Sequence, residues 1–271
     1  MAGRLEGKTA LVIGAGSVGP GWGNGKATSV LFAREGAQVF CVDINQAAAE
    51  ETAGIIRDEG GKAEAYAADV SKAGPVEAMV SAAHQALGRI DILHNNVGIV
   101  EVGGPVEASE ESWDRVMDIN IKSMFLTCKH VLPIMEAQFD AHGTGGAIVN
   151  IASIAGIRYT GVPYISYNAS KAAVIHFTRG VALQYAKKGI RANSILPGLM
   201  HTPMIREPLK GAYAGGDFDK MVELRDAQCP TGKMGDAWDV AYAGLYLASE
   251  EARYVTATEL LVDGGITAKF T

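Results

Sequence analysis

The chain has 271 residues, a net charge of −6 and a pI near 5.5, and this acidic balance argues against nucleic acid as a main partner. Hydrophobic residues make up 48% of the chain, which is ordinary for a globular protein with a large core. No apolar run reaches the roughly 18 residues that span a bilayer, and the first residues lack the apolar region of a signal peptide. The cysteines are odd in number and far apart, which suits a reducing compartment, and the histidines show no metal-binding spacing. We therefore expect a cytoplasmic protein with no membrane segment and no metal site.

The first part of the chain predicts a strand, a glycine-rich loop, a helix and a second strand. Residues 9–13 form a short apolar run, which is typical of a buried parallel strand. A glycine-rich stretch follows at residues 14–25, then a helical pattern closed by Gly36, then an apolar run at residues 38–43. Because a glycine motif in this context is far more specific than the motif alone, the order predicts a dinucleotide-binding unit.

Which glycines lie at the pyrophosphate is open from the sequence. The literal G-x-G-x-x-G match ends at Gly19, and the Pro20-Gly21 pair directly after it disfavours the start of a helix there. We therefore expect the helix to begin near Asn24 or Gly25, and residues 17–22 to form an inserted bulge. Free N–H groups and the helix dipole would favour phosphate at that helix end. The two candidate sets are Gly14, Gly16 and Gly19, or, as favoured here, Gly14, Gly23, Asn24 and Gly25.

Asp43 ends the second predicted strand. A carboxylate at this place accepts hydrogen bonds from both ribose hydroxyls of NAD and repels the 2′-phosphate of NADP. The next residue, Ile44, and those after it offer no arginine or lysine to neutralise such a phosphate. A helix cap or a turn is the alternative role for Asp43. We favour contact of Asp43 and Ile44 with the cofactor, and NAD as that cofactor.

The rest of the chain continues to alternate strands and helices. Further strands are expected at residues 63–68, 90–94, 147–153, 190–196 and 259–265. Further helices are expected at residues 46–59, 75–87, 110–139 and 238–248, and a helix that contains Tyr167 is expected to run through Tyr185. This alternation predicts an α/β fold: a single doubly wound Rossmann-type domain over residues 1–271, with about seven parallel strands flanked by helices. Residues 203–235 have no clear period and are expected to form a substrate lid.

Tyr167 and Lys171 stand four residues apart, which places both on one face of a helix. A fixed ammonium beside a phenol favours the phenolate, and a base working near neutrality needs this help because the ordinary pKa of a phenol is about 10. Such a pair also recurs by chance, so the spacing alone leaves its meaning open.

With the other motifs added, the chain resembles the short-chain dehydrogenase/reductase family, main branch. The matches run in order from Gly14 to Gly265, almost the whole chain. After the glycine loop they are Asp69-Val70, Asn95-Asn96-Val97-Gly98, Asn120, Ser153, Tyr167 with Lys171, Pro197-Gly198 and Val262-Asp263-Gly264-Gly265.

The resemblance implies a role for each matched residue. Tyr167 would be the general acid/base on the substrate oxygen, and Lys171 would lower its pKa and hold the nicotinamide ribose. Ser153 would orient the substrate oxygen, and Asn120 would hold a water that relays protons to Lys171. The implied cofactor contacts are Asp69 and Val70 at adenine, Asn96 and Gly98 on the adenosine ribose side, and Met200 and Thr202 over the nicotinamide.

The expected activity is NAD-dependent interconversion of a secondary alcohol and a ketone, with a small-molecule substrate. Two alternatives remain. Tyr164 stands seven residues before Lys171, and this spacing with a lengthened glycine loop is similar to the enoyl reductase branch. A non-catalytic regulator that senses NAD is the other, although it would predict a damaged tetrad.

The substrate pocket is expected from residues 100–104, 154–164 and 203–235. Its side chains suggest a largely apolar site without a dedicated arginine clamp, with Arg158 and Arg206 as the exceptions to consider. The resemblance also implies a homotetramer, with the helices near Asn120 and Tyr167 and the C-terminal strand at the interfaces.

Overall fold

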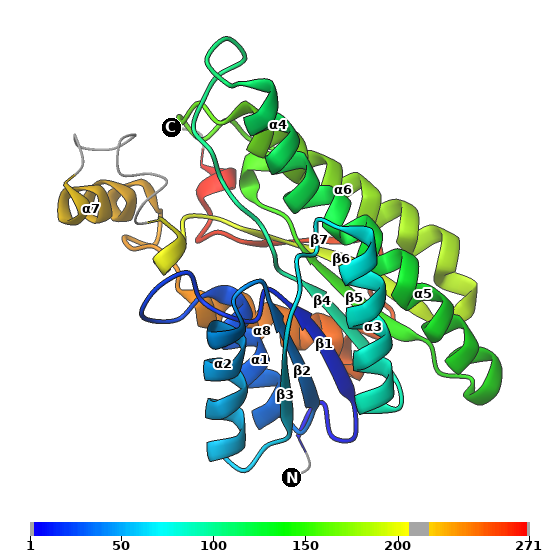
Figure 1. Cartoon of the computed structure of the whole chain (residues 1–271). Coiled ribbons are helices and arrows are strands. Elements are labelled where there is room, and N and C mark those ends of the chain that lie inside the picture. Colours follow the sequence, from blue (N-terminus) through cyan, green and yellow to red (C-terminus); the bar gives the residue numbers. More distant parts are fainter. Residues whose placement is uncertain (1–2, 206–216, 270–271) are drawn as a thin grey trace.

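One parallel sheet of seven strands forms the centre of the protein, with helices on both faces (Figure 1). The computed structural model describes residues 3–205 and 217–269, so Arg206 and part of the expected lid lie outside the described residues. The strands are β1 Thr9–Ile13, β2 Gln38–Asp43, β3 Ala63–Ala67, β4 Ile92–Asn95, β5 Gly146–Ile151, β6 Ile190–Pro197 and β7 Glu259–Val262. The predicted doubly wound fold is confirmed.

The strand order β3-β2-β1-β4-β5-β6-β7 places the start of the chain in the middle of the sheet. Ile13, the last residue of β1, pairs with Val42 of β2 on one side and with Asn95 of β4 on the other. The chain therefore changes direction across the sheet between β1 and β4. Ligands of such sheets bind outside the carboxyl ends of the strands at this switch point.

Alternation along β1 explains why helices cover both faces of the sheet. Leu11 and Ile13 belong to a buried cluster with α3 Ala73–Leu87, α5 Ser123–His142 and α6 Ile165–Tyr185. Ala10 and Val12 belong to a second cluster on the other face. Its helices are α1 Asn24–Arg34, α2 Gln46–Asp58 and α8 Ala237–Ala248. Successive side chains of a strand point to opposite faces, so one apolar run supplies both halves of the core.

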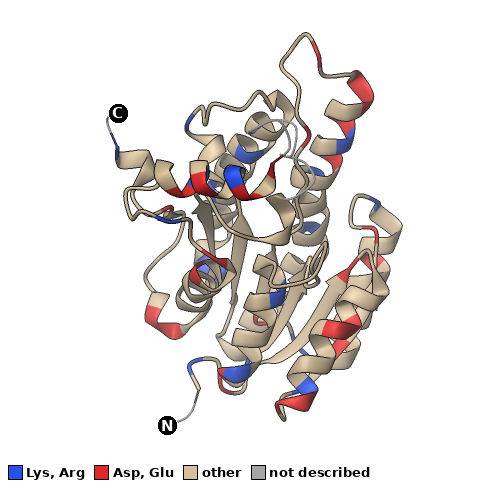
Figure 2. Cartoon of the chain, turned by 90° about the vertical axis from the view of Figure 1, so that its left-hand side faces the viewer, with Lys and Arg blue, Asp and Glu red and all other residues tan. Residues whose placement is uncertain are grey.

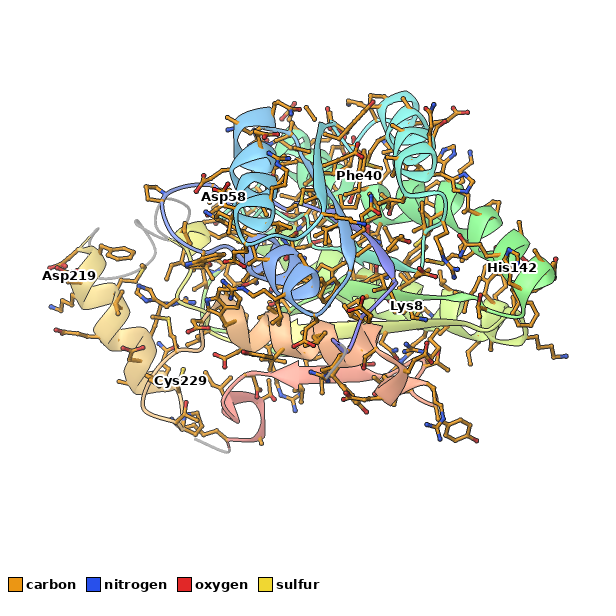
Figure 3. All side chains as sticks on the ribbon, turned by 90° about the horizontal axis from the view of Figure 1, so that it is seen from below. Lys8, Phe40, Asp58, His142, Asp219 and Cys229 are labelled. Atoms are coloured by element: carbon orange, nitrogen blue, oxygen red, sulfur yellow. The ribbon has the colours of Figure 1, made fainter. Side chains whose placement is uncertain are left out.

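Two helical regions differ from the expectation. The helix expected at residues 110–139 is α4 Glu110–Met117, a π-helical turn at Asp118–Lys122, and α5. The region expected at 203–235 as an irregular lid contains a 3₁₀ turn at Pro203–Ile205 and α7 Phe218–Gln228. Figure 3 shows Asp219 and Cys229 toward opposite ends of α7, which stands away from the sheet. Neither feature follows from hydrophobic periodicity, because a π turn adds one residue to a helix and α7 is short and polar.

Acidic and basic residues are interspersed over the helices, and the strands carry few of them (Figure 2). Among the described residues, no helix combines the length and the apolar character needed to cross a membrane.

Candidate active site

A single cavity of about 570 Å³ runs along the carboxyl ends of the central strands. Its wall includes Asp43 at the end of β2 and Tyr167 on α6. Except for Gly25 and Asn120, every residue proposed from the sequence for catalysis or cofactor binding lines this cavity. The fold therefore brings together side chains that lie more than a hundred positions apart in the sequence.

The glycine loop approaches the cavity through its backbone. Helix α1 begins at Asn24, as predicted, after Gly23, which has no side chain to cap the first N–H groups. Gly14 has a φ of +77°, and a Cβ there would lie 2.9 Å from Cγ2 of Val97. Only glycine fits this left-handed, crowded position. Gly14 and Gly23 line the cavity, and so does Gly16 of the literal motif.

Gly25 does not line the cavity, and its position gives it a different role. The residue is buried, and a Cβ built on it would lie 1.8 Å from the carbonyl oxygen of Gly14. The same Cβ would lie 2.6 Å from Nδ2 of Asn96, which donates a hydrogen bond of 3.0 Å to that carbonyl. Gly25 therefore lets the first turn of α1 pack directly on the loop, and it shapes the cavity from behind.

At one end of the cavity the side chains are acidic. Asp43 accepts the backbone N–H of Gly16 at 3.0 Å through one oxygen and that of Asn45 at 3.0 Å through the other. Asp69 accepts the hydroxyl of Ser71 at 2.7 Å, and this bond is the main cause that holds the pKa of Asp69 below its usual value. Both carboxylates are therefore fixed in place by donors from neighbouring residues. Ile44 and Val70, the residues that follow them, also line the wall.

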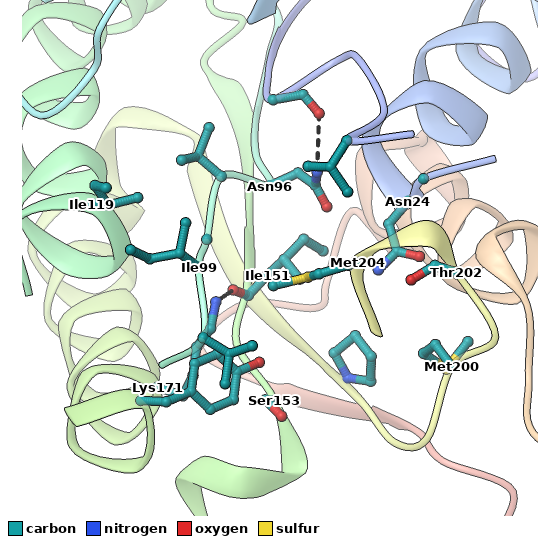
Figure 4. Close-up of a pocket in the computed structure, with 18 of the residues that line it drawn as sticks. Asn24, Asn96, Ile99, Ile119, Ile151, Ser153, Lys171, Met200, Thr202 and Met204 are labelled. Carbon is teal, nitrogen blue, oxygen red and sulfur yellow. Dashed lines mark hydrogen bonds between the residues drawn. The ribbon is translucent and has the colours of Figure 1, made fainter. Parts of the chain in front are cut away.

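At the other end lie the hydroxyl and amine groups. Ser153 follows β5, and Tyr167 and Lys171 project from α6. The Lys171 ammonium donates to the carbonyl oxygen of Ile151 at 2.9 Å and lies 5.6 Å from the centre of the Tyr167 ring. In Figure 4, Ser153 and Lys171 lie on one side of the cavity, with Asn24 and Thr202 on the other. Met200 and Thr202 line the cavity and are nearly buried.

Burial dominates the acid–base properties of this end. It raises the pKa of Tyr167 to about 12, against a hydrogen bond with Ser153 and the charge of Arg225, which both lower it. Burial also lowers the pKa of Lys171 to about 8. The phenol of Tyr167 is therefore protonated at neutral pH and can act as a proton donor.

Asn120 lies behind the cavity, at the centre of the π-helical turn. Its side chain accepts the N–H of Ile99 at 2.8 Å and donates to the carbonyl of Ile99 at 2.9 Å. It also donates to the hydroxyl of Ser170 at 3.0 Å, and Ser170 is the neighbour of Lys171. π turns occur often at functional sites, because the extra residue turns a side chain or a carbonyl out of the helical pattern. Through these hydrogen bonds, Asn120 connects the π-helical turn and α6 to the loop after β4.

Gly98 separates Asn120 from Lys171. A Cβ on Gly98 would lie 3.1 Å from Nζ of Lys171 and 3.5 Å from Oδ1 of Asn120. A side chain here would push the ammonium from its place, which explains the need for glycine in the Asn95-Asn96-Val97-Gly98 motif.

The wall beside Tyr167 contains Tyr164, as expected, and a residue that the sequence did not suggest. The Tyr164 ring meets Tyr167 edge to face, with ring centres 5.4 Å apart, and its hydroxyl bonds Thr160. Arg225 on α7 also lines the cavity and is 5% exposed. Arg158, which the sequence had suggested, is instead exposed and donates to the neighbouring carbonyl of Ile157. The four-residue spacing of Met221, Arg225 and Cys229 indicates one face of a helix but does not tell which element that face contacts.

Comparisons with known proteins agree with this geometry. A family model described as Enoyl-(Acyl carrier protein) reductase matches residues 20–267. The uncharacterized oxidoreductase YxbG of Bacillus subtilis (strain 168) is 38% identical over 98% of this chain and 93% of its own. Cyclohexanol dehydrogenase of Acinetobacter sp. (strain SE19) is also 38% identical, over 99% of this chain and 98% of its own.

Among solved structures, a Burkholderia xenovorans protein described as a short-chain dehydrogenase/reductase is 48% identical, with a TM-score of 0.93 over 100% of both chains. The glycine loop, the Ser153, Tyr167 and Lys171 groups and the strand order all occur within this matched length. The chain is therefore an oxidoreductase and belongs to the short-chain dehydrogenase/reductase family.

Proposed function

We propose that this enzyme interconverts a secondary alcohol and a ketone in the cytoplasm, with NAD as the hydride carrier. The observation that carries the proposal is the presence of the Ser153 and Tyr167 hydroxyl groups in the wall at one end of the cavity, with the Lys171 ammonium 5.6 Å from the centre of the Tyr167 ring. A single substrate oxygen can be within reach of both hydroxyls. The relative from Acinetobacter is named for a ring alcohol, cyclohexanol, which supports this substrate class.

The opposite part of the cavity fits a dinucleotide. Oδ1 of Asn24 is buried with no hydrogen-bond partner among the described residues, and Gly23 leaves the first turn of α1 uncapped. Gly14 keeps the backbone free of a side chain where a pyrophosphate would approach it. When bound, the dinucleotide would accept a hydride in oxidation and donate one in reduction.

The choice of NAD rests on charge. Asp43 is held at the cavity wall by two backbone donors, where it can accept from ribose hydroxyls and repel a phosphate. Lys26 is the basic residue nearest to the glycine loop, but its ammonium pairs with Glu51 and lies over the ring of Trp22. Among the described residues of the wall, the basic ones are Lys171 and Arg225, both near Tyr167. The adenosine end therefore offers nothing to neutralise a 2′-phosphate.

In ketone reduction, Tyr167 would donate its phenolic proton to the substrate oxygen as negative charge develops there. The hydroxyl of Ser153 accepts the N–H of Ala155 at 3.1 Å, which leaves its own hydrogen to bond the same substrate oxygen. In alcohol oxidation the phenolate would take up the alcohol proton, and Lys171 would stabilise that charge. Asn120 would support the route by which the proton returns from Lys171 to water, because it joins Ser170 to the backbone of Ile99.

The enoyl reductase alternative would make Tyr164 the acid. The printed description of the family model names that activity, and Tyr164 does line the cavity. However, its hydroxyl is bonded to Thr160, whereas Tyr167 lies beside Lys171 and shares the cavity wall with Ser153. The pairing of a phenol with a serine hydroxyl supports carbonyl rather than carbon–carbon double-bond reduction.

Assembly as a homotetramer belongs to the same proposal. Phe125 on α5 is 49% exposed and Leu183 on α6 is 72% exposed, and Leu261 on the edge strand β7 is 44% exposed. These apolar side chains lie on the helices and the strand where the family resemblance predicts subunit interfaces. Size-exclusion chromatography with light scattering measures the assembly directly.

The test of the proposed function is a screen of purified enzyme with NAD against steroid, sugar and cyclic secondary alcohols and hydroxy acids. We expect the absorbance of reduced nicotinamide to appear with at least one class, and not in a Tyr167→Phe variant. Oxidation of NADH with an enoyl thioester, but with none of the matching ketones, would contradict the proposal.

A further inference from the structure

The inserted loop, residues 17–22, forms part of the cavity wall beside the glycine motif. Ser17 and Val18 line the cavity, whereas Trp22 at the other end of the loop does not. Val18 is 82% exposed although it belongs to the wall, so a ligand in the cavity would cover an apolar side chain that otherwise meets water. The loop is therefore placed to contact a bound dinucleotide.

Trp22 fixes this loop to helix α8. Its ring centre lies 4.8 Å from that of Trp238, in the first turn of α8, and both rings pack against the buried cluster shared by β1, α1 and α8. The ammonium of Lys26 lies 5.1 Å from the centre of the Trp22 ring, and the guanidinium of Arg34 lies 5.2 Å from that of Trp238. Aromatic pairs and cations over ring faces both stabilise such a contact, so this end of the loop is firmly held.

The same end of α8 also holds the neighbouring part of the wall, residues 199–205. Gly235, just before α8, accepts the N–H of His201 at 2.7 Å and donates its own N–H to the carbonyl of Leu199 at 3.1 Å. Met200, which lies between these two residues in the sequence, lines the cavity. One short piece of chain therefore supports both the inserted loop and residues 199–205.

Pro203 joins the inserted loop to residues 199–205. A Cβ built on Gly19 would lie 3.7 Å from Cβ of Pro203, and one built on Gly21 would lie 3.6 Å from its Cγ. These are ordinary van der Waals distances, so the loop passes close to the proline ring. Figure 1 shows the loop after β1, in dark blue, beside the yellow turn that contains Pro203. The loop is thus held by α8 at one end and meets Pro203 along its middle.

We propose that Trp22 is a positioning residue for the dinucleotide: it holds Ser17 and Val18 in the wall beside residues 199–205, and thereby slows release of the bound dinucleotide. The inference rests on the proposed binding of a dinucleotide and adds a residue that lies outside the cavity. A wall that is ordered before the ligand arrives loses less conformational entropy on binding, so affinity rises without a new contact. Differences of this kind between variants of one site appear mainly in the dissociation rate.

The test measures release of the cofactor and not turnover. Enzyme loaded with NADH is mixed with an excess of NAD, and the loss of bound-nucleotide fluorescence gives the dissociation rate, while titration gives Kd. Trp22→Ala should raise both by about 3- to 30-fold, the range expected when one aromatic contact and one cation over a ring are lost. The rate of association should change little. The same measurements are made with NADPH.

The other variants separate this role from a general loss of stability. Trp22→Phe should keep most of the wild-type affinity, because a smaller ring can still pack on Trp238. Trp238→Ala should imitate Trp22→Ala, and the double variant should be little worse than either, since all three remove the same contact. Pro203→Ala should raise the dissociation rate by less. The matched control is Trp113→Ala, which removes a partly exposed tryptophan of α4 that does not line the cavity and should change neither constant.

Two results would overturn the proposal. The first is a folded Trp22→Ala variant that releases the nucleotide at the wild-type rate. The second is an additive effect of Trp22→Ala and Trp238→Ala, which would show that the two rings act separately. If Trp22→Ala does not fold, Pro203→Ala decides, and an unchanged dissociation rate in that variant overturns the proposal. A wild-type enzyme that binds neither NADH nor NADPH would contradict the proposed function as well.

Discussion

The two ends of the cavity are built by different means. At the adenosine end the backbone forms the site: Gly14 and Gly23 bring the main chain to the wall, and N–H groups fix Asp43. At the Tyr167 end, side chains from separate elements form it, with Ser153 from the end of β5, Tyr167 from α6 and Arg225 from α7. The first end is therefore set by the order of strand, loop and helix. The second depends on how several elements pack.

The largest expected effect comes from a substitution that should remove catalysis at the Tyr167 end of the cavity and leave NAD affinity nearly unchanged. Tyr167→Phe removes only the titrating oxygen, so kcat should fall roughly a thousandfold or more, in line with the loss of a general acid/base. NAD affinity, measured by fluorescence titration, should change little. Tyr164→Phe is the matched control, since it removes a phenol hydroxyl from the same wall and should keep most activity. An exchange of these two results would favour the enoyl reductase alternative.

A substitution at the adenosine end should have the converse effect: it should change the cofactor preference and leave kcat with NAD nearly unchanged. Asp43→Ala should narrow the preference for NAD over NADP by about a hundredfold, because like-charge repulsion of several kcal/mol is removed. The gain should appear mainly in KM for NADP, and kcat with NAD should stay close to that of the wild type. Asp58→Ala, at the exposed end of α2, is the control. An unchanged preference would mean that Asp43 does not face the ribose.

The ends should also differ in their dependence on pH. Alcohol oxidation needs the ionised Tyr167, and burial raises its pKa, so kcat/KM for the alcohol should rise with pH by up to tenfold per unit through the neutral range. Ketone reduction uses the protonated phenol and should stay level there, then fall at high pH. NAD affinity should remain nearly constant from about pH 6 to 7, because the pKa of Asp69 is lowered and its carboxylate stays ionised. If the chemical step limits the rate and kcat/KM for alcohol oxidation does not change with pH, this role of Tyr167 is contradicted.

The smallest expected effect concerns packing behind the glycine loop. Gly25→Ala would place a methyl group against the carbonyl of Gly14, so we expect the free energy of unfolding to fall by about 1–3 kcal/mol and NAD affinity to weaken several-fold. Gly54→Ala in α2 is the matched control, because its Cβ would have only Arg57 Nη2 nearby, at 4.0 Å. That change should leave the stability equal or slightly higher. If urea unfolding gave the same stability for both variants, the backbone of the glycine loop would have to shift at little cost in free energy to accept the added methyl group.

The sequence predicts the backbone-built end well because periodicity and glycine spacing report on local structure. The start of α1 at Asn24 follows from Pro20-Gly21, and the strand ending at Asp43 follows from its apolar run. The π turn around Asn120 is not visible in this way, since the apolar pattern passes through it without a break. Gly25 was assigned to the pyrophosphate because spacing does not distinguish a glycine that faces a ligand from one that faces another carbonyl.

Arg225 could not be placed for a different reason. It lies on a short helix with mixed polarity, and its burial depends on how α7 packs against Tyr164 and Tyr167. No local pattern encodes such a contact between distant segments. The part of the cavity wall that α7 supplies therefore required the structure.

The most direct test of the central claim is the ratio of kcat/KM for NAD and NADP in the wild-type enzyme, measured with one alcohol that the screen identifies. The account predicts that NAD is preferred by roughly a hundredfold or more, because Asp43 repels the 2′-phosphate and no cation among the described lining residues at that end offsets it. Equal or better use of NADP would contradict it.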